Sequence, residues 1–139
     1  MQDEPTPTEL TKAVADFLRN DIAPLISGHN SFKLRVAINA LDLVTRQLTL
    51  AQGSDAAEAA RLSQLLEMQG SLADLNRALA ERIASGEADL QTPGLAEHLW
   101  QTTMDKLAVD QPNYASYKRE LGEGGSTTKP SSSYVPCQE

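Results

Sequence analysis

Four polar side chains at helical spacing are the strongest indication of binding chemistry in this sequence. They interrupt the apolar segment 32–51 at intervals of four, three and four positions, as Arg35, Asn39, Asp42 and Arg46. In an α-helix this spacing places them in one narrow sector, the polar stripe, whose members can contact one another. Because a guanidinium group pairs bidentately with carboxylate or phosphate, the stripe could face an anionic ligand or a protein partner.

The polar stripe also has a purely structural interpretation. Apolar residues cover most of the remaining helix circumference, which is typical of a central helix that is contacted from several sides. Such a helix still meets water along one side, and there Asp42 and Arg46 would form an ordinary surface ion pair. The pattern alone leaves both interpretations open.

A second candidate contact region lies at the turn after the last long predicted helix. Pro112 ends that helix, and the Asp110 side chain can bond to nearby backbone and shape the turn. We therefore add Asp110 and Tyr114 to the candidate partner or ligand contacts. The alternative is a plain helix-terminating turn on which Tyr114 packs back. Within the helix itself, the spacing of Trp100 and Met104 favours a place in the core over a recognition patch.

Patterns typical of catalysis or metal binding are absent from the sequence. His29 and His98 are the only histidines, and no cluster of cysteines or carboxylates accompanies them at metal-ligand spacing. Nothing places a serine or cysteine nucleophile beside a histidine base, and there is no glycine-rich phosphate loop. We expect no catalytic residue, no metal and no cofactor, and we interpret His98 as a polar residue near a helix surface.

Composition and charge narrow the class of protein. The net charge of −7, from 12 Lys+Arg against 19 Asp+Glu, argues against binding to nucleic acid or to anionic membranes. The acidic start of the chain is unlike a secretory signal, and no apolar stretch approaches the roughly 20 residues of a transmembrane helix. The lone cysteine, Cys137, cannot form an internal disulfide. We therefore expect a cytoplasmic protein.

Apolar periodicity and capping residues predict an all-α fold. We expect a compact single-domain bundle of about five helices over residues 6–121. A capping box with proline at the first helical position starts the first helix at Thr6. The ends of the second to fifth helices are expected at Gly53, Gly70, Gly86 and Pro112. Residues 122–139, rich in Gly, Ser, Thr and Pro, are expected to form a disordered tail.

Three blocks of the sequence resemble an uncharacterised bacterial family of all-helical domains. The blocks are Phe32-x-x-Arg35-Val36-Ala37-x-Asn39-Ala40-Leu41 with Arg46, then Asp74-Leu75-x-x-x-Leu79, then Leu107-Ala108-Val109-Asp110-x-Pro112-x-Tyr114. The resemblance spans roughly Thr8 to Tyr114. Two positions depart from the family pattern, because Gln47 stands where glutamate is expected and Gln111 where asparagine is expected.

Members of this family look like small companions of hydroxyacyl-CoA kinases that have the aminoglycoside-phosphotransferase fold, such as the kinase of levulinate breakdown. The resemblance implies a non-catalytic accessory subunit that supports such a kinase in acyl-CoA catabolism, with the kinase subunit as its partner. It transfers no catalytic residues. The alternative is a stand-alone helical module that binds a CoA thioester or another anionic metabolite through Arg35 and Arg46.

Overall fold

The computed structural model describes residues 4–122, and this part of the chain consists of helices and their connections, with no strand. The helices are α1 (Pro7–Phe17), α2 (His29–Leu66), α3 (Leu72–Ser85), α4 (Leu95–Asp110) and α5 (Ala115–Glu120). A π-helical turn, Leu18–Ile22, and a 3-10 turn, Ala23–Leu25, join α1 to α2. The predicted all-α class with five helices is confirmed. The predicted disordered tail lies, apart from Gly122, outside the described residues.

The capping box that the sequence predicts at the start of α1 forms, and α3 begins with a similar cap. At α1 the Thr6 hydroxyl accepts a hydrogen bond from the Glu9 backbone N–H at 3.2 Å, and the Glu9 carboxylate accepts one from the Thr6 backbone N–H at 2.7 Å. Ser71 caps α3 in the same way by accepting from the Asp74 N–H. These contacts satisfy backbone donors that a helix start would otherwise leave unpaired.

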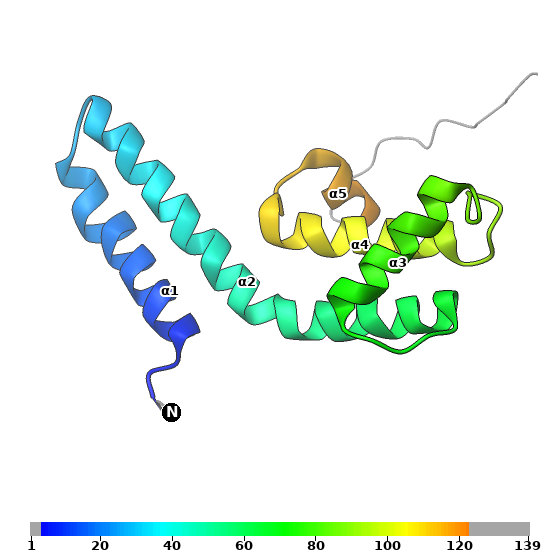
Figure 1. Cartoon of the computed structure of the whole chain (residues 1–139). Coiled ribbons are helices and arrows are strands. Elements are labelled where there is room, and N and C mark those ends of the chain that lie inside the picture. Colours follow the sequence, from blue (N-terminus) through cyan, green and yellow to red (C-terminus); the bar gives the residue numbers. More distant parts are fainter. Residues whose placement is uncertain (1–3, 123–139) are drawn as a thin grey trace, which may run out of the picture.

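The predicted helix end at Gly53 is wrong, because the expected second and third helices form the single 38-residue helix α2. Glycine weakens a helix interior by only about 1 kcal/mol, which packing on both sides can override. Figure 1 shows α2 changing direction near its middle. The sequence supplies a cause there, since Gly53 precedes Ser54 and sharp bends occur at such Gly/Ser pairs.

Replacing Gly53 with alanine is expected to raise the free energy of unfolding by about 1 kcal/mol. A Cβ atom built at this position meets no other atom within 4 Å, so the gain in helix propensity should not be cancelled by a clash. Urea denaturation followed by circular dichroism measures the change. A destabilised Gly53→Ala variant would mean that the bend depends on the glycine backbone itself.

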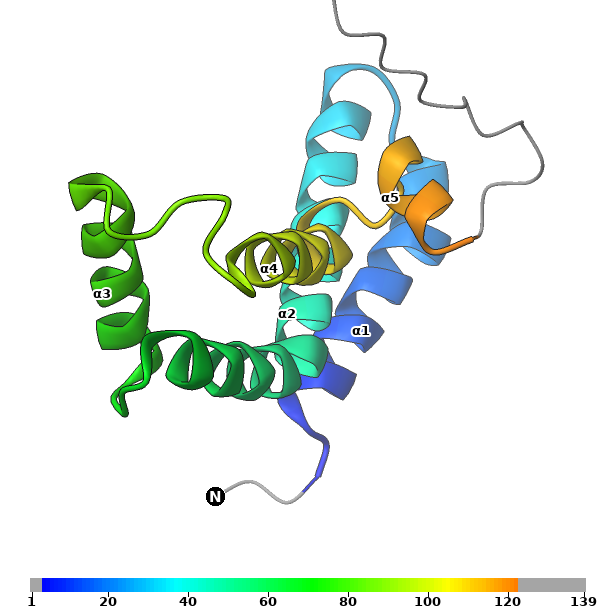
Figure 2. The ribbon, with the colours of Figure 1, turned by 90° about the vertical axis from the view of Figure 1, so that its right-hand side faces the viewer.

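α2 is the central element, and the other helices are arranged along its two halves. α1 packs against the amino-terminal half of α2, while α3 and α4 pack along the rest (Figures 1 and 2). The continuous hydrophobic core belongs to the carboxyl-terminal half alone. It is formed by buried residues of α2, α3, α4 and the α3–α4 loop: Leu62, Leu66, Leu75, Leu79, Ala88 and Leu95.

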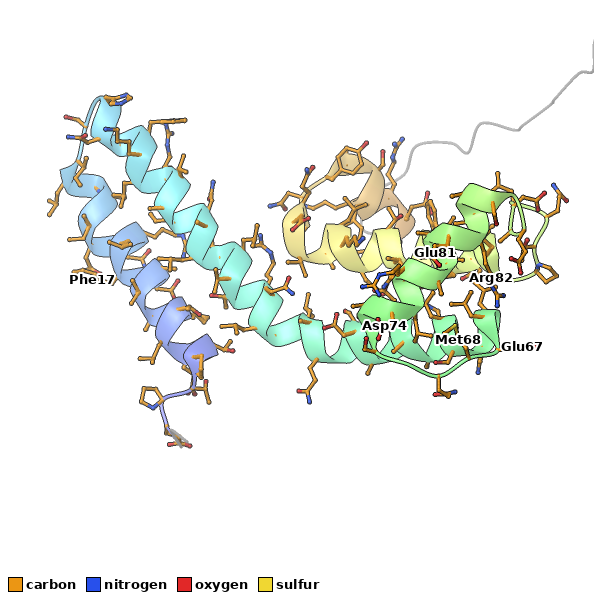
Figure 3. The ribbon with its side chains drawn as sticks, viewed as in Figure 1. Phe17, Glu67, Met68, Asp74, Glu81 and Arg82 are labelled. Atoms are coloured by element: carbon orange, nitrogen blue, oxygen red, sulfur yellow. The ribbon has the colours of Figure 1, made fainter. Side chains whose placement is uncertain are left out.

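The carboxyl end of α2 is closed by a charged side chain from α3. Arg82 donates a hydrogen bond to the Leu66 carbonyl oxygen at 3.2 Å, which satisfies one of the unpaired acceptors of the helix end (Figure 3). The next residue, Glu67, adopts a left-handed conformation with φ of 53°. The helix therefore ends at Leu66, four residues before Gly70, the expected end.

Two predictions on α4 are wrong in a complementary way. Trp100 is 49% exposed, although its helical spacing favoured the core, and His98 is 3% exposed, although we placed it near the surface. Periodicity locates residues on a helix but does not say which face the neighbouring elements cover. Here α4 turns the side of Leu95 and His98 towards α2 and leaves Trp100 in solvent.

Burial makes His98 a source of pH-dependent stability. Its Nδ1 atom is buried and has no hydrogen-bond partner within residues 4–122. Burial, together with the charge of Arg61, lowers the pKa of the imidazole, while Glu58 opposes this shift. The unfolded chain then binds a proton more readily than the folded chain. Titration of His98 therefore leaves the free energy of unfolding unchanged above pH ~6.5. Below this pH the free energy of unfolding falls as the pH decreases towards the lowered pKa of the folded state, by at most about 1.4 kcal/mol per pH unit.

We therefore expect His98→Gln to remove part of the loss of stability between about pH 7 and pH 5. Urea midpoints measured at both pH values test this. His29→Gln is the matched control because His29 is the second histidine of the chain and is exposed at the start of α2. Identical profiles for the wild type and His98→Gln would contradict the assignment.

Candidate functional site

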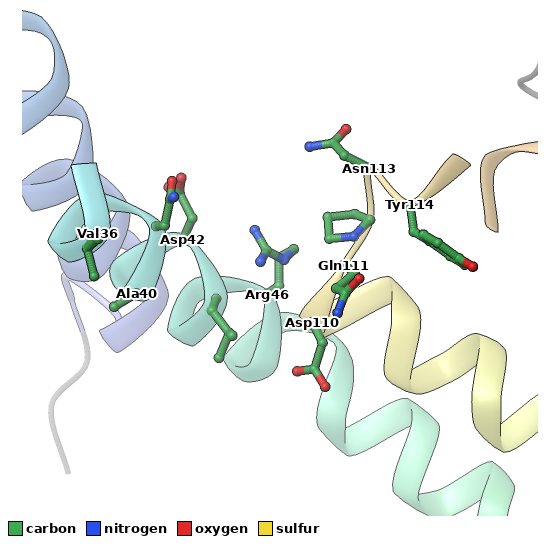
Figure 4. A pocket seen from close by; sticks show the side chains of 11 residues that line it. Val36, Ala40, Asp42, Arg46, Asp110, Gln111, Asn113 and Tyr114 are labelled. Atoms are coloured by element: carbon green, nitrogen blue, oxygen red, sulfur yellow. The ribbon is translucent and has the colours of Figure 1, made fainter. Parts of the chain in front are cut away.

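The structure brings the two predicted contact regions together in one groove. The groove lies between the amino-terminal half of α2 and the turn after α4, and it encloses about 690 Å³ (Figure 4). Most of the candidate residues line it, namely Asn39, Asp42, Arg46, Asp110 and Tyr114. The remaining lining residues are Val36, Ala40, Leu43, Gln111, Pro112 and Asn113. Arg35 is exposed in the same stripe but does not line the groove.

The floor of the groove is apolar and comes from α2. Val36, Ala40 and Leu43 recur at intervals of four and three, so they form one row beside the polar stripe. All three are exposed, and Val36 retains 51% of its accessible surface. An exposed row of this kind next to charged side chains suits an amphipathic occupant, whose apolar part covers the row and whose polar part meets the stripe.

Arg46 fastens the two walls of the groove to each other. Its Nε donates a hydrogen bond to the Val109 carbonyl oxygen at 2.6 Å, in the last turn of α4. A guanidinium charge is favourable there because the carboxyl end of a helix dipole is negative. Within residues 4–122 no carboxylate oxygen lies within 4.0 Å of the Arg46 guanidinium nitrogens. The outer Nη donors therefore remain available on the groove side (Figure 4).

Asp42 pairs with a side chain outside the stripe, so the Asp42–Arg46 ion pair of the purely structural interpretation does not form. Arg19, in the π-helical turn after α1, places its Nη2 2.8 and 2.7 Å from the two Asp42 carboxylate oxygens. The same guanidinium contacts Asp16 at 2.8 Å through Nη1. Side chains 23 positions apart make this contact, and helical spacing within α2 cannot reveal it. Asp42 therefore borders the groove as a carboxylate that is already paired with Arg19.

The turn after α4 presents its side chains outward. The Tyr114 backbone N–H donates to the Gln111 carbonyl oxygen at 2.9 Å, which closes the turn before α5 begins. Tyr114 is 49% exposed, so it does not pack back in the way that a plain helix-terminating turn predicts. A half-exposed tyrosine at the rim of a groove is typical of a binding surface, because its ring supplies contact area at low entropic cost.

Sequence reasoning missed the apolar and turn residues of the groove. The apolar pattern of α2 suggests core positions for Val36, Ala40 and Leu43, and only the tertiary structure shows that they stay exposed in the described chain. The sequence predicts Pro112 only as a helix terminator, and it does not single out Asn113. The width of the apolar face on α2 could have revealed these residues. A helix that is apolar over more of its circumference than one neighbour covers indicates a further neighbour.

The groove contains binding groups and no arrangement typical of bond chemistry. Its ionisable side chains are Asp42, Arg46, Asp110 and Tyr114, with no serine, cysteine or histidine among the lining residues. In the part of the chain that the structure describes, no group of three or more His, Cys, Asp or Glu residues is placed to hold a metal ion. No helix in that part is both long enough and apolar enough to cross a bilayer.

An all-helical domain with a groove of mixed apolar and polar lining is thus the class that the fold and the site define. Residues 24–114 match the model of the family described as Domain of unknown function (DUF6285), which covers more than half of the chain. The chain belongs to this family. All residues of the groove lie within the matched range. No curated protein and no solved structure matches the chain.

Proposed function

We propose that this chain is a non-catalytic subunit that binds a hydroxyacyl-CoA kinase of the aminoglycoside-phosphotransferase fold through the groove between α2 and the turn after α4. The observation that supports the proposal most is the convergence of two sequence-distant regions, the polar stripe and residues 110–114, on one surface. The same two regions carry the resemblance to kinase companion subunits. The function that follows is support of a partner enzyme in acyl-CoA catabolism.

The chemistry of the groove fits a protein partner. Exposed Val36 and Leu43 offer an apolar strip, and Tyr114 stands at its rim, a combination that resembles the buried centre of protein interfaces. Arg46 can pair with a carboxylate of the partner, because its Nη groups have no carboxylate within reach in the described chain. An amphipathic partner helix with one acidic residue matches both features.

Co-expression with the phosphotransferase encoded nearest to this chain tests the proposal. The two proteins are expected to co-purify, and the kinase is expected to phosphorylate hydroxyacyl-CoA substrates faster with this chain than without it. The kinase with a buffer control, and this chain alone with the substrates, complete the comparison. A kinase that neither binds this chain nor changes its rate would refute the proposed function.

The second candidate is a module that binds a CoA thioester or another anionic metabolite, favoured by one observation. The groove volume of about 690 Å³ is within the range of small-molecule sites, and Arg46 stands beside an apolar floor. Isothermal titration calorimetry with acetyl-CoA on the isolated chain separates this candidate from the first. Saturable binding that is lost in Arg46→Ala supports the second candidate. The absence of any heat of binding rules this candidate out.

A further inference from the structure

A second exposed apolar surface lies on the α1–α2 hairpin, away from the groove. We define this apolar flank by six residues on one side of the hairpin: Leu10, Val14 and Phe17 of α1 with Ala37, Val44 and Leu48 of α2. All six are exposed, and each of the five larger side chains retains between 42% and 54% of its surface. On the whole hairpin the buried residues are only Ala15 and Ile38. The two helices alone therefore form no closed core.

Contacts between α1 and α2 show that these residues share one side. A hydrogen bond of 2.9 Å between Thr11 and Thr45 marks the contact line of the two helices. Arg19 and Asp42 pair on one side of this line. The flank residues lie on the opposite side of this line. Around the axis of α1 they are turned from Thr11 in the direction opposite to Arg19, and around the axis of α2 they are turned from Thr45 in the direction opposite to Asp42. The hairpin thus has one charged side and one apolar side.

Charges are absent from the apolar flank although the chain is strongly acidic. Between Leu10 and Phe17 the only charged residues are Lys12 and Asp16, which pair with each other at 2.9 Å on the charged side. Between Ala37 and Ala51 the only ones are Asp42 and Arg46. With a net charge of −7, two copies of this chain repel each other over most orientations. Their uncharged flanks can meet without placing like charges opposite each other.

The size of the flank matches what a stable dimer requires. The five larger side chains leave about 450 Å² of apolar surface exposed, judged from their exposed fractions. A standard interface buries about 800 Å² on each partner, of which roughly 500 Å² is apolar in homodimers. Two helices with one uncovered side are half of a four-helix bundle, and a second identical hairpin supplies the missing half around a two-fold axis.

We propose that the apolar flank is an interface between two copies of this chain, which pair their α1–α2 hairpins into an intermolecular four-helix bundle. None of the six residues of the flank lines the groove, so the two surfaces use different side chains. The inference does not depend on the identity of the kinase or on its binding.

Sedimentation velocity of the full chain over a wide concentration range tests the dimer. The wild type is expected to sediment as a dimer that dissociates on dilution. Val14→Glu places a charge in the centre of the flank twice per dimer, and it is expected to weaken the dimer by about 100-fold or more. Leu90→Glu is the matched control, since Leu90 is an exposed leucine in the α3–α4 loop and its substitution should leave dimerisation unchanged.

Folding of each variant is verified by circular dichroism, because the substituted side chains are exposed and the helical content should be preserved. Val44→Glu, on the α2 side of the flank, repeats the test with a second residue. A wild type that is monomeric at all concentrations overturns the proposal, as does a dimer that both flank variants leave intact. Loss of kinase binding in Val14→Glu with a monomeric wild type would also overturn it, and would assign the flank to that partner.

Discussion

Replacing Leu62 with alanine is expected to lower the free energy of unfolding by about 3–5 kcal/mol. Leu62 has no accessible surface and lies in the cluster that joins α2 to α3 and α4. Removing three carbon atoms there loses transfer free energy and leaves a cavity that the surrounding leucines cannot fill without strain. Single domains of this size have a total stability of about 5–15 kcal/mol, so the loss is a large fraction of it.

Urea denaturation measures this effect with two independent signals. Trp100 is the only tryptophan and lies on α4, so its fluorescence follows the packing of α4, while circular dichroism follows all helices. Leu90→Ala is the control, because Leu90 is 72% exposed and the change should cost less than about 0.5 kcal/mol. A cost below 1 kcal/mol for Leu62→Ala would show that the helices on the second half of α2 do not form the stabilising core.

Replacing Arg46 with alanine is expected to lower both the stability of the protein and the proposed binding of a partner in the groove. The hydrogen bond from Arg46 Nε to the Val109 carbonyl oxygen is short and has a charged donor, and its loss should cost about 1–3 kcal/mol. Partner affinity should fall by at least about 30-fold, since the turn is released from α2 and the exposed Nη donors are lost. Arg46→Lys keeps the charge but cannot reproduce the planar fork, so we expect an intermediate loss.

Arg35→Ala is the matched control for this experiment. Arg35 is an arginine of the same helix and stripe, but it is exposed and lies outside the groove. Its replacement should change stability by less than about 0.5 kcal/mol and partner affinity by no more than about threefold. Thermal unfolding and a titration of the proposed kinase partner with each variant provide the two measurements. Equal losses of affinity for Arg35→Ala and Arg46→Ala would mean that the whole stripe, and not the groove, forms the contact.

Helix identity and helix starts were predictable because they depend on local interactions. Thr6 and Ser71 cap their helices through contacts three residues apart, and such contacts are encoded in short segments. The helix end predicted at Gly53 does not occur, because this position depends on contacts between helices and not on local interactions. A glycine in a helix costs about 1 kcal/mol, and the packing of neighbouring helices on both sides of the position decides whether that cost is overcome.

The candidate site was predicted in its polar residues and missed in its apolar ones. A polar residue in an apolar helix is conspicuous in the sequence, so Asn39, Asp42 and Arg46 stood out. An apolar residue such as Leu43 looks the same whether a neighbour covers it or not. The partners of the charges were also hidden, because Arg19–Asp42 and Arg46–Val109 join positions 23 and 63 residues apart.

The sequence by itself determined that this protein is all-helical, acidic and equipped with a polar stripe and a proline-ended turn as separate features. Periodicity, capping and composition act over a few residues, and all of them can be read along the chain. Only the tertiary structure decided that α2 runs unbroken through the molecule, that the stripe and the turn face each other across one groove, and that His98 is buried while Trp100 is not. These outcomes depend on which helix faces cover one another, and contacts between distant segments set that choice.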